Sequence, residues 1–135
     1  TGALDVIGSH AIDAARWLVG EIDTVSALIT NPLTAPPRGE PIDTVDALVQ
    51  FAGGATGTIS ATLIAPGRKN RLGWEINGSK GSVYWDLENL NVLHHHARSG
   101  ASHEGFMEII VNEEHHPLVA GRLAHHGAED HPDHG

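Results

Sequence analysis

Apolar residues recur at helical spacing near the start of the chain, which predicts an amphipathic helix there. The apolar face comprises Ile12, Ala15, Leu18 and Val19, and the polar face comprises His10, Asp13 and Arg16. Gly8 and Ser9 break the preceding pattern, so Ser9 is predicted to be the N-cap of a helix that begins at His10. Gly20 is predicted to stop that helix.

After the helix, apolar and polar residues alternate as in β-strands with one solvent-exposed face. The predicted strands span residues 22–30, 44–52, 55–65, 72–77, 82–87, 90–95 and 106–111. Residues 31–41 hold four of the seven prolines and predict a loop. Short turns such as Gly53–Gly54 and Gly78–Ser82 join most of the other strands, and short turns require antiparallel neighbours. The pattern predicts an α+β fold: an open, mainly antiparallel sheet of about six or seven strands, with the N-terminal helix packed on one face.

The length of 135 residues fits one domain, which we assign to residues 1–114. From residue 115 onward the periodicity stops and histidine and acidic residues dominate, so residues 115–135 are predicted to be a flexible tail. An unpartnered face of the sheet would favour self-association, and we expect a homo-oligomer that forms through the sheet.

Composition excludes several functions. A formal net charge of -9 argues against binding to a nucleic-acid backbone, and the sequence has no apolar run long enough to span a membrane. The absence of cysteine excludes thiolate metal sites and fits a cytoplasmic location. His94, His95 and His96 are consecutive, so only two of them share a strand face, and we predict no metal site. The one basic cluster, residues 68–71, is interpreted either as an anion site or as a solvated loop.

Four stretches carry a family resemblance. They are residues 2–21 (GALDVIGSHAIDAARWLVGE), 51–62 (FAGGATGTISAT), 65–93 with its GSKGS turn, and the His116–Pro117 pair. Together they resemble the C-terminal domain of the Gfo/Idh/MocA family of NAD(P)-dependent oxidoreductases, which act on sugars, polyols and related compounds. The resemblance implies the same α+β layout. It also implies a Rossmann domain of the parent polypeptide as partner, NAD or NADP as cofactor of the intact enzyme, and a sugar- or polyol-like substrate.

His10 matches the family histidine that lies beside the nicotinamide and helps to bind or deprotonate the substrate alcohol. In the first turn of a helix the environment is positive, which would favour a neutral ring able to exchange a proton. The alternative is a histidine that bonds only to nearby backbone. Asp13 matches the acid of the family's H-x-x-D pattern and would orient His10 or bind substrate. Its alternative role is a structural carboxylate that pairs with Arg16 or with a backbone amide.

One position departs from the family pattern. Many members carry an aspartate four residues before the histidine, where this chain has Val6, and the nearest acid is Asp5, a further substrate-binding candidate. The family's catalytic lysine lies in a Glu-Lys-Pro motif of the nucleotide domain, and neither Lys69 nor Lys80 has that context.

No G-x-G-x-x-G fingerprint follows a strand in this sequence, so the cofactor-binding residues stay unknown and the Rossmann domain is expected outside this chain. We therefore expect the isolated chain to bind no nucleotide and to be inactive. The leading hypothesis is the C-terminal domain of an oxidoreductase that transfers hydride between a nicotinamide and a sugar or polyol. The alternative hypothesis is a non-catalytic sheet domain for dimerisation or small-ligand binding.

Overall fold

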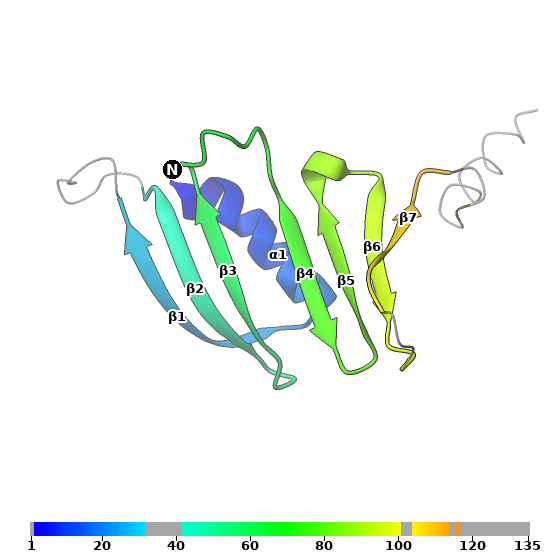
Figure 1. The fold of residues 1–135 in the computed structure, drawn as a ribbon. Helices are drawn as coiled ribbons and strands as arrows, with labels where there is room; N and C mark the ends of the chain where they lie inside the picture. Colours follow the sequence, from blue (N-terminus) through cyan, green and yellow to red (C-terminus); the bar gives the residue numbers. More distant parts are fainter. Residues whose placement is uncertain (1, 32–41, 101–103, 114–115, 117–135) are drawn as a thin grey trace, which may run out of the picture. The chain divides into compact units, whose positions relative to one another are not determined.

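The computed structural model describes residues 2–31, 42–100, 104–113 and 116. The chain divides into two compact units, residues 1–69 and residues 70–135. The first contains a helical segment and three strands, and the second contains four strands and a short 3-10 helix (Figure 1). The tail predicted at residues 115–135 lies, except for His116, outside the described residues.

The first unit begins with a π-helical turn, η1 (Leu4–Gly8), that runs directly into the α-helix α1 (Ser9–Leu18). Gly8 and Ser9 both have helical dihedral angles, and the Ser9 N–H donates to the Leu4 carbonyl, as in a π turn. The predicted helix start was therefore wrong. The Ser9 hydroxyl does not cap a helix but donates back to the Asp5 carbonyl at 3.0 Å. The predicted stop is confirmed, because Gly20 has φ +128° just beyond the helix.

Three antiparallel strands form the sheet of this unit in the order β1 (Ile22–Thr30), β2 (Thr44–Phe51) and β3 (Thr56–Thr62). Two-residue alternation along β2 separates a buried face from an exposed face. The Gly53–Gly54 turn is confirmed: Gly54 has φ +87°, and its N–H donates to the Phe51 carbonyl at 2.8 Å.

The core of the first unit lies between the helical segment and the buried face of the sheet. Its buried apolar residues are Ala3, Val45, Val49, Phe51 and Ala61. The helix approaches β3 closely, since a Cβ atom built on Gly8 would lie 3.5 Å from that of Ala61. Figure 1 shows α1 lying across one face of these strands. The prediction of a helix packed on one sheet face is confirmed.

The second unit is a four-stranded antiparallel sheet whose order follows the sequence. Its strands are β4 (Gly73–Gly78), β5 (Gly81–Asp86), β6 (Val92–Ala97) and β7 (Met107–Ile110), and the 3-10 helix η2 (Leu87–Asn89) joins β5 to β6. The pairing places Trp74, Trp85, Leu93 and Ile109 on one face, and Glu75, Tyr84, His94 and Glu108 on the other.

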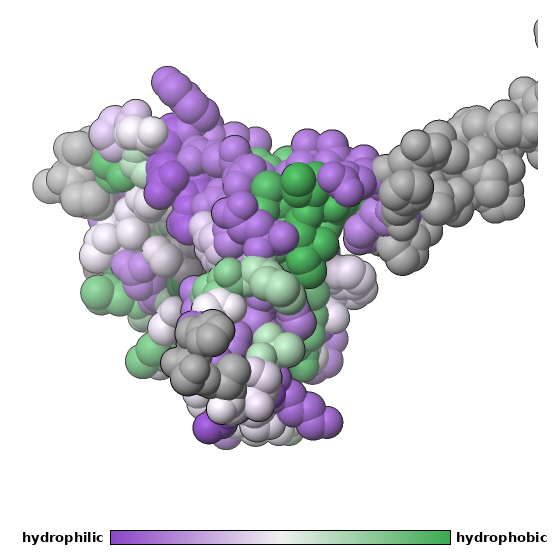
Figure 2. All heavy atoms as spheres, turned by 45° about the vertical axis from the view of Figure 1, so that its right-hand side comes forward, coloured by the Kyte–Doolittle hydropathy of each residue, from purple (hydrophilic) through white to green (hydrophobic). Residues whose placement is uncertain are grey.

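The seven antiparallel strands found among the described residues, with the helix, confirm the predicted α+β class, and their hydrogen bonds divide them into one sheet of three and one of four. None of the helices in the described part of the chain has the length and apolar character needed to cross a bilayer. Large apolar side chains do reach the surface among hydrophilic ones (Figure 2), including Trp17, Leu28 and Leu48.

Gly81 closes the β4–β5 hairpin and offers a test of the second sheet. A Cβ atom at this position would collide with the carbonyl oxygen of His96 on β6. We expect Gly81→Ala to lower the free energy of unfolding of this sheet by about 1–3 kcal/mol, since backbone atoms must move apart. Urea titration followed by tryptophan fluorescence would measure the change.

Gly53→Ala is the matched control, because a Cβ atom there meets nothing within 4 Å. We expect it to change the free energy of unfolding by at most about 0.5 kcal/mol. Equal effects of the two substitutions would contradict the close approach of Gly81 to β6.

Candidate functional site

His10 and Asp13 lie on the outward face of α1, and both side chains are exposed. The opposite face carries Ile12, Ala15 and Leu18, which are half-buried. Residues three apart are neighbours on a helix surface, so the imidazole and the carboxylate stand beside each other. The amphipathic pattern of the sequence therefore gave the correct outward face for these two residues.

The environment predicted for His10 was wrong in one respect. Because the helical segment starts near Ala3, His10 lies about two turns from the unpaired N–H groups and not in the first turn. The N–H groups at the start are engaged: that of Ala3 donates to the Ile42 carbonyl at 2.6 Å. The helix dipole acts within the first turn, so its positive end lies away from His10.

The purely structural roles considered for His10 and Asp13 find no support among the described residues. No hydrogen bond of the His10 ring to backbone is present in this part of the chain. Arg16 does not pair with Asp13 but forks onto Glu21, with Nε and Nη2 donating at 2.9 and 2.8 Å. This hydrogen bonding raises the pKa of Arg16 and lowers that of Glu21. Asp13 adds only a weaker electrostatic attraction to Arg16.

Asp5 is exposed on the π turn, and its carboxylate points to the start of the chain. Its Oδ2 accepts a weak hydrogen bond, 3.4 Å long, from the Gly2 N–H. Val6, the residue four positions before His10, is 49% exposed. His10 and Asp13 therefore lie one turn apart on the exposed face of α1, and the Asp5 carboxylate lies at the helix start.

Asp86 is the one buried charged residue among those described, and the sequence reasoning missed it. Its Oδ2 accepts from Arg71 Nε at 2.8 Å and from the Tyr84 hydroxyl at 3.2 Å, and its Oδ1 accepts from the Glu88 N–H at 3.0 Å. Burial raises the pKa of Asp86, but these hydrogen bonds and the Arg71 charge outweigh burial, so its pKa is lowered. The signal in the sequence was an aspartate at the N-cap of the η2 turn. Arg71, a member of the basic cluster at residues 68–71, therefore forms an ion pair with Asp86.

Two of the consecutive histidines on β6 each lie close to a glutamate of the second unit. His94 Nε2 lies 3.4 Å from Glu108, and His96 Nε2 lies 3.3 Å from Glu104. Glu104 also accepts from the N–H groups of Ser99 and Gly100, at 3.0 and 2.6 Å. These backbone bonds are the main reason that the pKa of Glu104 is lowered. In the part of the chain that the structure covers, no three such side chains converge as metal ligands would.

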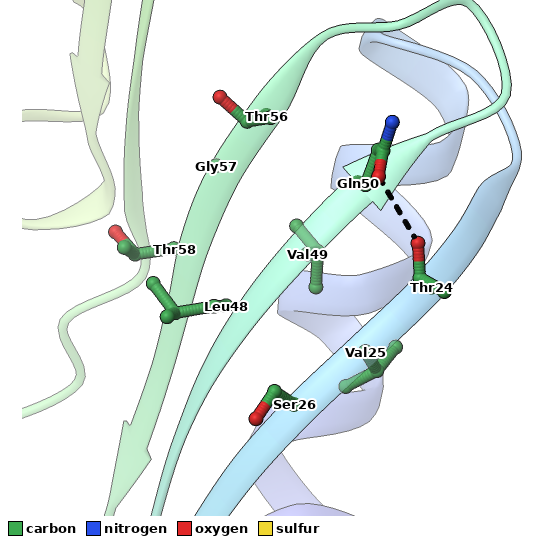
Figure 3. A pocket seen from close by; sticks show the side chains of 9 residues that line it. All are labelled: Thr24, Val25, Ser26, Leu48, Val49, Gln50, Thr56, Gly57 and Thr58. Atoms are coloured by element: carbon green, nitrogen blue, oxygen red, sulfur yellow. Dashed lines mark hydrogen bonds between the residues drawn. The ribbon is translucent and has the colours of Figure 1, made fainter.

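The face of the first sheet opposite α1 carries a shallow hollow (Figure 3). Strand register places Leu48 of β2 between Ser26 of β1 and Thr58 of β3 on this face. Leu28 and Leu48 are 65% and 64% exposed, and their surroundings include threonine, serine and Asp46. The Thr24 hydroxyl donates to Gln50 Oε1 at 3.3 Å, which ties the two strands at one end of the hollow. The sequence showed that this face would be exposed but did not place the hollow.

Comparison with known proteins gives a consistent result. A family model described as the GFO/IDH/MocA C-terminal domain matches residues 1–84. Levoglucosan dehydrogenase of Pseudarthrobacter phenanthrenivorans is 33% identical over an alignment 137 residues long, gaps included, which covers 85% of this chain and 35% of the relative. The chain thus spans about a third of the length of that relative.

Solved structures agree with the sequence matches. Levoglucosan dehydrogenase in complex with NADH and levoglucosan superposes with a TM-score of 0.79 at 34% identity, covering 90% of this chain and 34% of that protein. Its complex with NADH and L-sorbose gives the same values. An oxidoreductase domain protein from Kribbella flavida has a TM-score of 0.75 at 36% identity, over 90% of this chain and 36% of that protein.

The hydrogen bonds and ion pair of Asp86 predict how the stability of the fold changes at acidic pH. Since the pKa of Asp86 is lowered by folding, its stabilisation is fully present above the unfolded value of about 3.9 and is lost as pH falls through the folded pKa. Asp86→Asn should cost about 1–3 kcal/mol at pH 7, because Arg71 loses its anionic partner. Urea unfolding of wild type and variant at pH 7 and near pH 3 would measure both effects.

The difference between wild type and Asp86→Asn should shrink toward the acidic end. Asp23→Asn, which changes an exposed aspartate on β1, serves as the control and should leave stability nearly unchanged at both pH values. A constant difference across the pH range would refute the assigned role of the Asp86 carboxylate.

Proposed function

This chain belongs to the GFO/IDH/MocA C-terminal domain family, and on that premise we propose that it forms the substrate side of an NAD(P)-dependent oxidoreductase. Its substrate would be a sugar, a polyol or a related compound, as in the relatives crystallised with levoglucosan or L-sorbose. The observation that carries the proposal is the exposed His10–Asp13 pair on the outward face of α1.

His10 is the proposed catalytic residue. An exposed imidazole can accept the proton of a substrate hydroxyl as hydride leaves the carbon that bears it, and can return the proton in the reverse direction. Asp13, one turn further along the helix, would orient the imidazole or hold a neighbouring hydroxyl. Neither residue is committed to another hydrogen bond among the described residues, which leaves both available for substrate.

The cofactor would be held mainly by the rest of the polypeptide. The start of the helical segment offers no cradle for a pyrophosphate, because Gly2 N–H donates to Asp5 and Ala3 N–H donates to Ile42. The nicotinamide, when bound by a Rossmann domain outside this chain, supplies the hydride transfer. This chain would supply proton handling and substrate orientation, and in isolation it would bind no nucleotide. The cysteine-free sequence fits a cytoplasmic location for the whole enzyme.

Asp5 is the weaker of the substrate-binding candidates. Its carboxylate is occupied with the Gly2 N–H, and Val6 takes the position at which many family members carry an acid. The π turn directly before His10 favours a functional role for this region, since such turns are frequent at functional sites. We propose that Asp5 contacts substrate only after this hydrogen bond opens.

The first test is steady-state kinetics of the polypeptide that contains this chain and its dinucleotide-binding domain. The substrates would be levoglucosan, L-sorbose, D-glucose and myo-inositol, each with NAD and NADP. We expect His10→Ala to lower kcat by about 100-fold or more, as for the loss of a general base, with a smaller loss for Asp13→Asn.

His95→Ala and Asp23→Asn are matched controls, because each changes the same residue type on a strand and not on α1. Both should leave kcat within a factor of about 3 of wild type. Unchanged activity of His10→Ala would make the histidine structural. A wild type that turns over none of the substrates would favour the non-catalytic sheet domain.

We also propose that the open face of the first sheet is covered by a second copy of this chain. Leu28 and Leu48 are exposed on this face, which also carries threonine and serine hydroxyls and the exposed Asp46 opposite Leu28. Such a surface can pack on its own copy around a two-fold axis, because each leucine meets apolar or hydroxyl-bearing surface on the other copy.

Charge placed on that face should break the assembly. We expect Leu48→Glu to convert the oligomer to a monomer in sedimentation-velocity experiments, because association would bury the new carboxylates without partners. Leu90→Glu is the control, since Leu90 is also exposed (55%) but lies beyond η2 in the second unit. A wild type that sediments as a monomer at high concentration would exclude this interface.

A further inference from the structure

The three tryptophans of the chain have different surroundings. Trp74 and Trp85 stack in the second sheet, with ring centroids 6.2 Å apart, and Trp85 Nε1 donates to the Leu90 carbonyl at 3.0 Å. Trp17 on α1 is 84% exposed, more than any other large apolar side chain in the described part of the chain. Ring stacking and this hydrogen bond account for the two half-buried tryptophans, Trp74 and Trp85, and leave Trp17 unexplained.

Trp17 shares a helix face with the proposed site. It follows Asp13 by four residues and His10 by seven, which is two helical turns or about 10.5 Å along the axis. Side chains on an α-helix lean toward its N-terminus, so the indole extends from its own turn toward the turn that carries Asp13. The imidazole, the carboxylate and the indole thus follow one another along a single stripe of α1.

We propose that the Trp17 indole stacks on the apolar C–H face of the sugar whose hydroxyls His10 and Asp13 bind; this inference rests on the proposed function. A sugar ring has polar hydroxyl groups at its edge and C–H groups on its faces. A flat aromatic ring matches the C–H face, while a carboxylate matches neighbouring hydroxyls. An exposed tryptophan beside an exposed acid therefore fits a polyhydroxylated ring, and Trp17 would fix the orientation of its reactive carbon toward His10.

The test uses the polypeptide that contains this chain and its dinucleotide-binding domain, with the four sugars and polyols named above. Trp17→Ala should raise KM for the sugar by about 10-fold or more while kcat falls by less than about 3-fold, the pattern of lost ground-state binding. Trp17→Phe should recover most of the loss, because it keeps an aromatic face. KM for NAD or NADP should stay unchanged, and so should all constants of the control Leu90→Ala.

Fluorescence gives a readout that needs no turnover. Adding the sugar to the enzyme loaded with NAD or NADP should change the tryptophan emission of wild type, and this change should be lost in Trp17→Phe. Trp74 and Trp85 remain in both proteins and provide the constant background.

The outcomes separate the inference from the proposed function. An active wild type whose sugar KM is unaffected by Trp17→Ala overturns the role of Trp17 and leaves the oxidoreductase in place. A Trp17→Ala variant that raises KM for the dinucleotide and not for the sugar shows that the indole packs against the cofactor domain, and also overturns it. A wild type that neither turns over nor binds any of the sugars overturns the proposed function, and this inference with it.

Discussion

The first unit depends on the burial of one helical segment against two strands. Ala3, Val45, Val49, Phe51 and Ala61 are its buried apolar residues, and the buried Gly8 lies beside Ala61. Buried apolar area is the main source of stability in so small a core. Because this contact fixes the rotation of the helix, it also fixes which side chains turn outward. The outward stripe carries His10, Asp13 and Trp17.

The π turn is a local consequence of the same packing. The segment is held at its start by the hydrogen bond from Ala3 to Ile42, and further along by contact with β3. A π turn places one more residue in a helical turn than an α-helix does, which changes the rotation of the residues before it relative to those after it. The Ser9 hydroxyl, bonded to the Asp5 carbonyl, supplies a further hydrogen bond across this turn. The helical segment before His10 is therefore irregular around Val6, the position at which this sequence departs from the family pattern.

Polar groups are distributed unevenly over the two units. In the second sheet, Asp86 is satisfied by Arg71, Tyr84 and the backbone, and His94 and His96 each face a glutamate. Hydrogen bonds of the kind that Asp86 makes stabilise a sheet because they satisfy a buried polar group. On α1 the arrangement is the reverse, since His10 and Asp13 are exposed and make no such bonds among the described residues. That contrast is why we assign the chemistry to the helix and a structural role to the sheet cluster.

The sequence by itself determined the class of fold, the strands and the outward face of the helix, because two-residue and helical periodicities are local properties of the chain. The stop at Gly20 and the Gly53–Gly54 turn were also readable, since both need backbone angles that glycine allows. The helix start was misjudged: Gly8 and Ser9 resemble a break, yet both have helical dihedral angles and continue the π turn into α1. Only the tertiary structure showed that Asp86 is buried and paired with Arg71, and that Trp17 is left exposed beside His10 and Asp13. Burial and pairing depend on residues distant in the chain, and local pattern carries no record of which distant residues meet.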